Sequence, residues 1–181
     1  MLVYYGIFFF FVLVVIFLGY QMIVYYFVRV PYLGTPKERF ALIFDYIFKQ
    51  EKIKKSAKLV DLGCGYGRVL FEAEHRGMKN LTGFELSPLY LWWGKLLSCF
   101  YQSRVRLERK NFMQEDLSVY DVIYIFLTSN ALPALSVKLK KEAKKGALII
   151  ILGQKLPNFS VTKDVVANVK KNIHLYFYKI S

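Results

Sequence analysis

The stretch VDLGCGYGR, residues 60–68, decides the fold of this chain. The short apolar run 58–62 is typical of a buried strand, and the pattern of residues 68–76 predicts a helix that ends at Gly77. Glycines at the end of a first strand let the backbone approach a ligand closely and let the next helix begin tightly. The stretch therefore predicts a strand-turn-helix unit with a ligand at its turn.

The acidic residue ahead of the glycines indicates which ligand this turn binds. The dinucleotide fingerprint is G-x-G-x-x-G, and its third glycine would fall on Arg68, whereas this chain reads Asp-x-Gly-x-Gly-x-Gly from Asp61. The charge of Asp61 would repel a pyrophosphate but suits a cofactor with a positively charged amino group. This contrast favours S-adenosylmethionine over NAD, and a purely structural glycine turn is the alternative interpretation.

Strand-like and helix-like segments alternate along the rest of the chain. Further strands are expected at 81–84, 105–110, 121–126 and 147–152, and helices at 88–102 and 135–144. Such alternation predicts a parallel sheet that is covered on both faces. The last two strand-like segments, 161–166 and 173–180, leave no room for a long helix between them. The expected fold class is therefore α/β, a Rossmann-like and mostly parallel sheet with an antiparallel pair at one edge.

The N-terminal segment differs in composition from the rest. No residue from Leu2 to Val28 is charged, and roughly 20 apolar residues suffice to cross a bilayer core of about 30 Å. A cleaved signal peptide would have a basic segment before a shorter apolar core, and a core helix that is apolar on every face would need a much larger protein around it. We therefore expect one transmembrane helix, which anchors residues 1–29 in a membrane.

Basic residues after this segment indicate its orientation and a second membrane contact. Arg29, Lys37 and Arg39 follow the apolar run and no basic residue precedes it, which predicts a single-pass protein with a cytoplasmic C-terminal domain. The formal net charge is +13. A basic patch next to a membrane anchor favours anionic lipid headgroups, with nucleic acid as the alternative partner. The patch consists of Lys49, Lys52, Lys54, Lys55 and Lys58.

Residues 30–58 are expected to form a connector and an amphipathic helix. The sequence TPKE, residues 35–38, has the form of a capping box in which Thr35 is the N-cap. Apolar residues then recur at helical spacing, which predicts one buried face. These residues are Phe40, Ile43, Phe44 and Ile47.

At this point the glycine stretch resembles the first motif of class I methyltransferases, which transfer a methyl group from S-adenosylmethionine. The resemblance implies that Gly63 and Gly65 shape the loop around the methionine part of the cofactor, with Asp61 near its amino group. Cys64 belongs to the same loop, where a small side chain is sufficient. The resemblance also implies that residues 59–181 form the methyltransferase domain.

Residues after two further strands are candidates for cofactor binding. Glu85 comes directly after the strand 81–84, about 20 residues past the glycines, where a carboxylate accepts hydrogen bonds from both ribose hydroxyls. An ordinary exposed carboxylate is the alternative. After the third strand, the family resemblance implies that Asn111 hydrogen-bonds the adenine amino group and that Phe112 packs on the ring. Asp116 is the alternative to Asn111, unless it only caps a loop.

The end of the fourth strand is where methyltransferases place the methyl acceptor. Thr128, Ser129 and Asn130 are the candidates there, and positioning of the acceptor is expected to dominate catalysis. This segment has neither the Asn/Asp-Pro-Pro-aromatic motif of nucleobase amino methylases nor a cysteine for pyrimidine chemistry. No metal-binding acidic cluster is evident, so no metal is expected.

A narrower resemblance covers nearly the whole chain. The apolar helix, the connector PYLGTP at 31–36, the glycine stretch and the sequence GFELSP at 83–88 are similar to the membrane-anchored protein-lysine methyltransferases of mitochondria, which modify the adenine nucleotide translocase and the ATP synthase c-subunit. The resemblance implies that the connector helps to close the active site, so Tyr32 and Thr35 become candidate catalytic residues. Tyr66 departs from the family pattern, which commonly has an acidic residue there.

The expected function is therefore methylation of a lysine on a membrane-associated protein. Three alternatives stay open: an enzyme that methylates a lipophilic small molecule such as a quinone, an RNA methyltransferase, and a non-catalytic cofactor-binding module on a membrane. The sequence does not identify the acceptor, the number of methyl groups or the oligomeric state. Neither His75 nor His174 is a convincing general base, because one lies in a helix away from the strand ends and the other in an edge strand.

Overall fold

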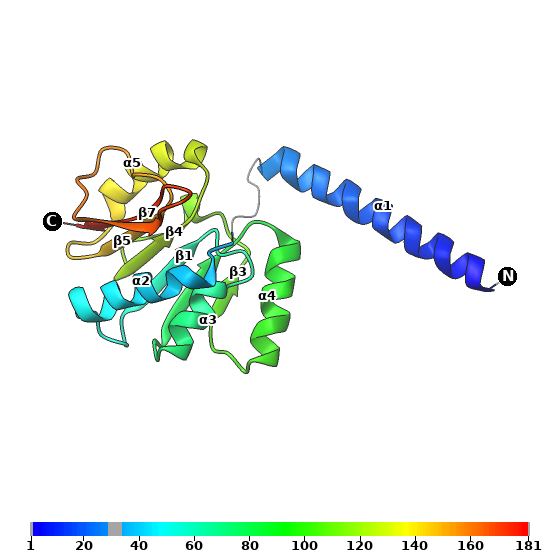
Figure 1. The fold of residues 1–181 in the computed structure, drawn as a ribbon, viewed down its shortest axis with the longest axis horizontal. Helices are drawn as coiled ribbons and strands as arrows, with labels where there is room; N and C mark the ends of the chain where they lie inside the picture. The colour runs from blue at the N-terminus through cyan, green and yellow to red at the C-terminus, as the bar shows by residue number, and fades with distance from the viewer. Residues whose placement is uncertain (1, 29–33, 181) are drawn as a thin grey trace. The chain divides into compact units, whose positions relative to one another are not determined.

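A computed structural model describes residues 2–28 and 34–180 and divides the chain into two units, one N-terminal and one that begins at Leu33 (Figure 1). The N-terminal unit is the helix α1, Leu2–Val28, of 27 residues. Its described side chains are almost all exposed, including the four consecutive phenylalanines 8–11 at 64–69%. The expected apolar helix is confirmed, and by length and composition it could cross a membrane.

The second unit is built on a seven-stranded sheet with the order β3-β2-β1-β4-β5-β7-β6. The five strands from β3 to β5 are parallel, while β7 runs antiparallel to β5 and β6 antiparallel to β7. The mostly parallel sheet with an antiparallel edge pair is thereby confirmed. The strands are β1 Lys58–Leu62, β2 Asn80–Phe84, β3 Arg106–Glu108, β4 Val122–Ile125, β5 Leu148–Leu152, β6 Lys163–Asn168 and β7 Ile173–Lys179.

The two edge strands are short or irregular. β3 has three residues and exposes Arg106. β6 begins with the exposed residues Lys163 and Asp164, and its pairing with β7 is interrupted by a bulge between Val166 and Asn168. The central strands β1, β4 and β5 are apolar and buried almost throughout, as parallel strands covered on both faces must be.

Helices cover both faces of the sheet. The α2, α3 and α4 side has a core that includes Phe44, Ile47, Leu70 and Tyr124, and the α5 side has a core that includes Leu135. All four apolar residues of the expected amphipathic helix are buried in the first core, as their spacing predicted. The helical elements are η1 Lys37–Arg39, α2 Phe40–Asp45, the π-helical turn η2 Tyr46–Gln50, α3 Arg68–His75, α4 Pro88–Phe100, η3 Phe112–Gln114, η4 Ser129–Ala131 and α5 Leu132–Glu142.

The expected capping box at Thr35 is wrong. The first helical turn begins at Lys37 with Pro36 as its N-cap residue, and no side chain of the described residues caps it. The Thr35 hydroxyl is hydrogen-bonded instead to the Tyr124 hydroxyl, at 2.8 Å. Tyr124 lies in a central strand and is 1% exposed, so its hydroxyl needs a buried partner, and Thr35 provides it.

Candidate active site

The glycine turn after β1 has a backbone that only glycine adopts easily. Gly63, Gly65 and Gly67 have φ values of +80°, +56° and +89°. The amides of Gly63 and Cys64 donate to the carbonyl oxygen of Phe84, at 2.9 and 3.0 Å. The turn therefore crosses from the end of β1 to the end of β2 and brings both strand ends to one place.

Asp61 is a buried carboxyl at the end of β1. It is 4% exposed, and its register partners are Gly83 on β2 and Tyr124 on β4. Burial raises the pKa of Asp61 to about 8, and the neighbouring carboxylate of Glu85 contributes to the increase. A positively charged group bound here would reverse this shift, so the site is electrostatically suited to the cationic cofactor that the sequence predicted.

Glu85 holds the glycine turn from the end of β2. Its Oε2 accepts a hydrogen bond from the Gly65 amide at 2.9 Å, and its Oε1 accepts one from the Ser87 amide at 2.7 Å. Ser87 lies directly before α4, so one carboxylate fixes both the turn and the start of a helix. Glu85 is half-buried and bonded to two backbone amides, so it is not an ordinary exposed carboxylate, and its role in ribose binding stays a prediction.

Cys64 contributes packing to the same turn. The side chain is 7% exposed, and a Cβ built on Gly83 would lie 2.6 Å from its Sγ. Burial, together with the charges of Asp61 and Glu85, raises the pKa of the Cys64 thiol well above its ordinary value. The thiol is thus neutral and directed against β2, and contact between Cys64 and a ligand would have to come from its main chain.

The two candidates for the adenine end have different environments. Asn111 follows β3 and is half-buried, and its Oδ1 accepts a hydrogen bond from the Met113 amide at 3.0 Å. A carbonyl oxygen has two lone pairs, so Asn111 can still accept a second bond. Asp116 is exposed and caps a loop by accepting from the Ser118 amide at 2.8 Å, and hydrogen bonds from the Ser118 side chain and amide lower its pKa. The half-buried Phe112 packs against the α5-side core.

The end of β4 carries a hydroxyl without a partner. Thr128 Oγ1 is buried and has no hydrogen-bond partner among the residues that the structure describes. Ser129 and Asn130 are exposed in the short helix η4. An unpaired buried hydroxyl is unfavourable unless a ligand satisfies it, so Thr128 is the strongest of the three acceptor-site candidates.

Sequence reasoning missed Tyr124. Its apolar surroundings in β4 indicated only a core position, yet its hydroxyl joins Thr35 of the connector to the strand that neighbours Asp61. Burial raises the pKa of Tyr124 well above its ordinary value, so it remains a neutral hydrogen-bonding group. Of the two connector candidates, Thr35 therefore lies close to the strand ends, and Tyr32 lies outside the described residues.

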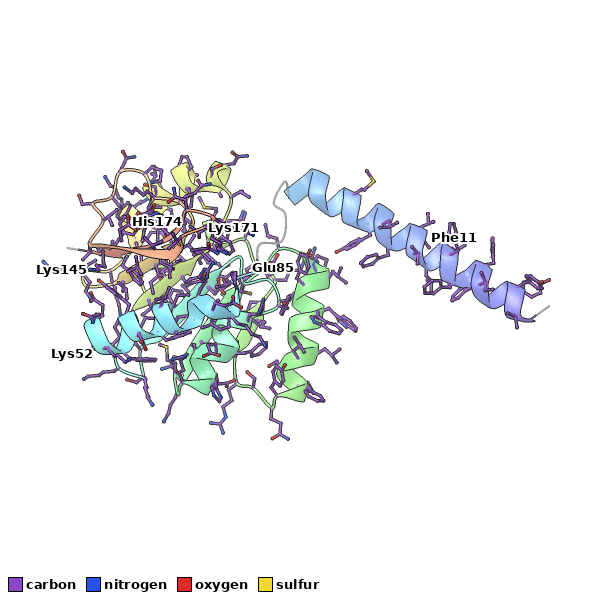
Figure 2. The ribbon with its side chains drawn as sticks, viewed as in Figure 1. Phe11, Lys52, Glu85, Lys145, Lys171 and His174 are labelled. Atoms are coloured by element: carbon purple, nitrogen blue, oxygen red, sulfur yellow. The ribbon has the colours of Figure 1, made fainter. Side chains whose placement is uncertain are left out.

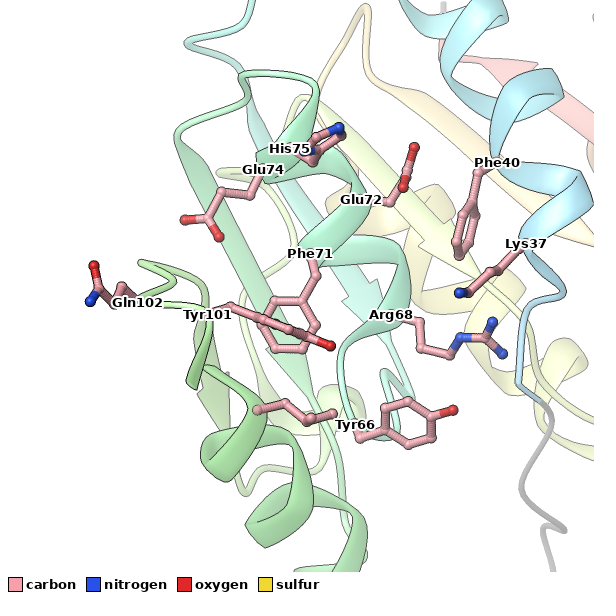
Figure 3. A pocket seen from close by; sticks show the side chains of 11 residues that line it. Lys37, Phe40, Tyr66, Arg68, Phe71, Glu72, Glu74, His75, Tyr101 and Gln102 are labelled. Atoms are coloured by element: carbon pink, nitrogen blue, oxygen red, sulfur yellow. The ribbon is translucent and has the colours of Figure 1, made fainter. Parts of the chain in front are cut away.

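A cavity of about 780 Å³ lies on the outer side of α3, between the start of the α2 segment and α4 (Figure 3). Tyr66 and Arg68 line the cavity from the glycine turn, and His75 lines it from the last residue of α3. None of the candidate cofactor residues lines this cavity. We therefore propose that the cofactor binds at the carboxyl ends of the strands and not in this cavity.

Residues 61–163 match the model of a known family, the ANTKMT methyltransferase domain. The match begins at the acidic residue of the glycine turn and extends to the start of β6, so it contains every strand end described above. The chain belongs to the ANTKMT methyltransferase family.

Curated relatives of this ANTKMT-family chain are protein-lysine methyltransferases. A protein-lysine N-methyltransferase of Saccharolobus islandicus is 25% identical over 157 residues, which are 82% of this chain and 93% of the relative. The adenine nucleotide translocase lysine N-methyltransferase of Mus musculus is 26% identical over 67% of this chain, and the ATP synthase c-subunit lysine N-methyltransferase of Caenorhabditis elegans is 30% identical over 60%. This chain spans 52% and 61% of those two proteins.

The fold of the ANTKMT-family chain recurs in solved methyltransferases. An RNA methyltransferase from Salinibacter ruber, crystallised with S-adenosyl-L-homocysteine, has a TM-score of 0.70 and 17% identity over 82% of this chain and 94% of that one. The cofactor is S-adenosylmethionine, as the acidic residue ahead of the glycines predicted. When bound, it supplies an electrophilic methyl group on a sulfonium.

Replacement Glu85→Gln is expected to weaken cofactor binding by about 10- to 100-fold, because hydrogen bonds to a charged acceptor contribute about 1.5–3 kcal/mol. The side-chain amide introduced by this change would also face a backbone N–H with a donor instead of an acceptor. Titration calorimetry with S-adenosylmethionine measures the change. Glu38→Gln, at an exposed position of η1, is the matched control. Equal affinities of the two variants would contradict a cofactor role for Glu85.

The bond between Thr35 and Tyr124 can be tested by a double-mutant cycle. Thr35→Val and Tyr124→Phe each leave one buried hydroxyl unpaired and should each lower the free energy of unfolding by about 1–3 kcal/mol. The double variant removes both hydroxyls and should cost less than the sum of the two single changes. Urea denaturation measures all four proteins, and strictly additive losses would show that the two hydroxyls do not interact.

Proposed function

We propose that this chain methylates the side-chain amine of a lysine on a membrane-associated protein. The observation that carries the proposal is the family match, together with relatives whose named substrates are the adenine nucleotide translocase and the ATP synthase c-subunit. The relative from Saccharolobus islandicus, of which this chain covers 93%, is also named a protein-lysine N-methyltransferase. The solved RNA methyltransferase shares the fold at 17% identity and does not favour an RNA substrate.

The proposed anchor is α1. Its segment Val3–Tyr20 is strongly hydrophobic and contains no charged residue, and this supports a single-pass membrane helix. Arg29, Lys37 and Arg39 follow it closely, which favours a cytoplasmic catalytic domain. The net charge of +13 would attract the domain to an anionic surface. Of the basic patch, Lys52, Lys54, Lys55 and Lys58 are exposed, and Lys49 pairs with Asp45 at 3.0 Å.

In this proposal the residues at the strand ends orient the reactants. Asp61 binds the ammonium of the cofactor, Glu85 the ribose and Asn111 with Phe112 the adenine. The unpaired Thr128 hydroxyl accepts a hydrogen bond from the incoming lysine amine. The glycine turn contributes main-chain contacts to the methionine part.

Removal of the lysine proton follows from the environment and requires no dedicated base. A desolvated ammonium has a lowered pKa, and in-line transfer then depends on alignment and exclusion of water. Neither histidine is placed as a base: His75 lies on the outer side of α3, and His174 Nδ1 is 2.6 Å from an Asp164 oxygen on β6. The proposal gives Thr35, which is hydrogen-bonded to Tyr124, the role of covering the strand ends from the connector.

The test is to incubate membranes of the host with purified full-length protein and S-adenosylmethionine carrying a labelled methyl group. We expect label on lysine side chains of membrane proteins, identified by mass spectrometry of peptides. Asp61→Asn serves as the inactive control. Label recovered only in the lipid extract would instead support a lipophilic acceptor, and label only in RNA a nucleic-acid acceptor, and either result would overturn the proposal.

A further inference from the structure

The outer side of α4 is an exposed aromatic surface. Trp92, Trp93, Leu96 and Phe100 are 61%, 47%, 47% and 82% exposed, and we call these four residues the α4 face. Three of them are spaced by four residues along the helix and so lie on one stripe, and the two indole rings are 6.3 Å apart. The α4 face is therefore one contiguous apolar surface.

The inner side of α4 is fixed to the active site. Gly94 faces inward, and a Cβ there would lie 2.8 Å from Leu107 Cδ1 and 3.0 Å from the backbone of Tyr66. The helix begins directly after Ser87, whose amide is bound by Glu85. Whatever binds the α4 face is thus rigidly connected to the glycine turn.

The rest of the described domain surface has no comparable set of large side chains. Its other exposed large apolar residues are Leu86 and Tyr101, which flank α4 in the chain, and valines on other segments, such as Val119, Val137 and Val169. Scattered apolar residues are normal on a soluble surface, whereas a contiguous patch of tryptophan, leucine and phenylalanine marks an interaction surface.

Charge and composition of α4 favour a lipid surface as the partner. The helix contains no acidic residue, and Lys95 is exposed beside the aromatic stripe. The segment that follows adds the exposed Arg104 and Arg106. Tryptophan is enriched at the membrane interface, and helices with Trp, Phe and Leu next to basic residues lie in the headgroup layer of anionic bilayers.

We propose that the α4 face inserts into the interfacial layer of the membrane that α1 anchors. The proposal rests on the anchoring by α1 proposed above. Seven residue steps separate Val28, the last residue of α1, from Thr35, which is bonded to the core of the domain, and this length of chain spans at most about 25 Å. The domain is then always within reach of the bilayer surface.

The α4 face and the basic patch are distinct contact surfaces. Lys52 lies at the end of the domain opposite to α4 (Figure 2). A bilayer along the outer side of α4 therefore does not touch this part of the patch. A contact through the lysines would be weakened by salt, whereas burial of aromatic side chains would not.

Tryptophan fluorescence, excited selectively so that tyrosine does not contribute, reports on the α4 face alone, because Trp92 and Trp93 are the two tryptophans of the whole chain. The full chain is reconstituted into anionic lipid vesicles with or without bromine on the lipid acyl chains. We expect blue-shifted emission that brominated lipid quenches strongly and acrylamide quenches weakly. The quenching by bromine should persist at about 1 M salt, where the Debye length is only roughly 3 Å.

Several results would overturn the proposal. Strong quenching by acrylamide without quenching by bromine would place the α4 face in water. Bromine quenching that disappears at high salt would assign the contact to the basic patch. Blue-shifted emission that depends on protein concentration and is not quenched by bromine would indicate that a second copy of the chain covers the α4 face. Failure of the chain to float with lipid would overturn the anchoring as well, and the other outcomes would leave the anchoring intact.

Surface variants provide a second test of the membrane contact of the α4 face. Leu96→Asp and Phe100→Asp place a charge on the α4 face and should abolish most of the bromine quenching. Val137→Asp, at a position of α5 that is 66% exposed, is the matched control and should leave the quenching unchanged. All three variants should bind S-adenosylmethionine as the unaltered chain does, because none of these side chains belongs to the cofactor site. Unchanged quenching in Leu96→Asp and Phe100→Asp would overturn the proposal.

Discussion

Asp61→Asn should lower the affinity for S-adenosylmethionine by about 100-fold and at the same time stabilise the domain by about 2–4 kcal/mol at pH 7. The affinity falls because the carboxylate proposed to bind the cofactor's ammonium is removed. The stability rises because the wild-type carboxyl is buried beside Glu85, which raises its pKa to about 8. Calorimetry measures the first effect and urea denaturation the second.

The pH dependence of the free energy of unfolding follows from the same shift in the pKa of Asp61. The folded-state pKa of Asp61 is about 8 and its ordinary value is 3.8, so the folded domain retains a proton that the unfolded chain releases. This contribution to stability is complete below pH 3.8 and is lost progressively as the pH rises to about 8. Asp61→Asn should remove this loss between these pH values, whereas Asp116→Asn, at the exposed loop cap, should not.

The affinity for the cofactor should change with pH in the opposite direction to the stability. A bound cation favours the ionised carboxyl, so binding releases a proton below pH 8 and the affinity should increase as the pH rises toward that value. Calorimetry in two buffers of different ionisation enthalpy counts the released proton. An Asp61→Asn variant that released the same proton, or that was no more stable than the unaltered chain, would contradict the role assigned to Asp61.

Gly63→Ala should destabilise the domain by about 3 kcal/mol, the sum of a strained left-handed backbone and an overpacked contact. The φ of Gly63 is +80°, and a Cβ there would lie 2.8 Å from Leu127 Cδ2. Because the glycine turn would shift, cofactor binding should also be lost. Urea denaturation and calorimetry measure the two effects.

Gly146→Ala separates the effect of backbone strain from the effect of the overpacked contact. Gly146 also has a φ of +80°, but a Cβ there would meet no atom within 4 Å, so this variant carries the backbone strain alone, about 1–2 kcal/mol. The difference between the two variants measures the contact with Leu127. Equal losses of stability, together with intact cofactor binding in Gly63→Ala, would show that the turn tolerates a side chain at this position.

The sequence predicted the features that depend on near neighbours in the chain. Glycines at a strand end, the buried strand patterns and the pair of closing strands are local signals, and the structure has all of them. The prediction for Thr35 was wrong because it, too, relied only on near neighbours in the chain. Its local context, TPKE, is a good capping box, and nothing nearby in the chain reveals that Tyr124, 89 residues away, offers a buried hydroxyl. Tyr124 itself was hidden by its apolar neighbours in β4.

Side-chain partners in the site were equally invisible in the sequence. The position of Glu85 after an apolar strand indicated a ligand residue, but the bond to the Gly65 amide depends on how two strand ends meet. The unpaired hydroxyl of Thr128 and the inward direction of Cys64 are also consequences of tertiary packing. A pattern of residue types can identify a strand end, and only the folded sheet determines which atoms remain available there.

If the chain is anchored as proposed, the irregular edge strands of the sheet affect how copies of the domain interact on the membrane. Proteins held on a bilayer share a thin layer, where encounters between copies are far more frequent than in free solution. Long, regular outer strands would invite such copies to join edge to edge into aggregates. The three-residue β3 with its exposed Arg106, and β6 with Lys163, Asp164 and a bulge, offer poor templates for strand addition. In the proposed membrane-anchored state, these edges therefore disfavour edge-to-edge association between neighbouring domains.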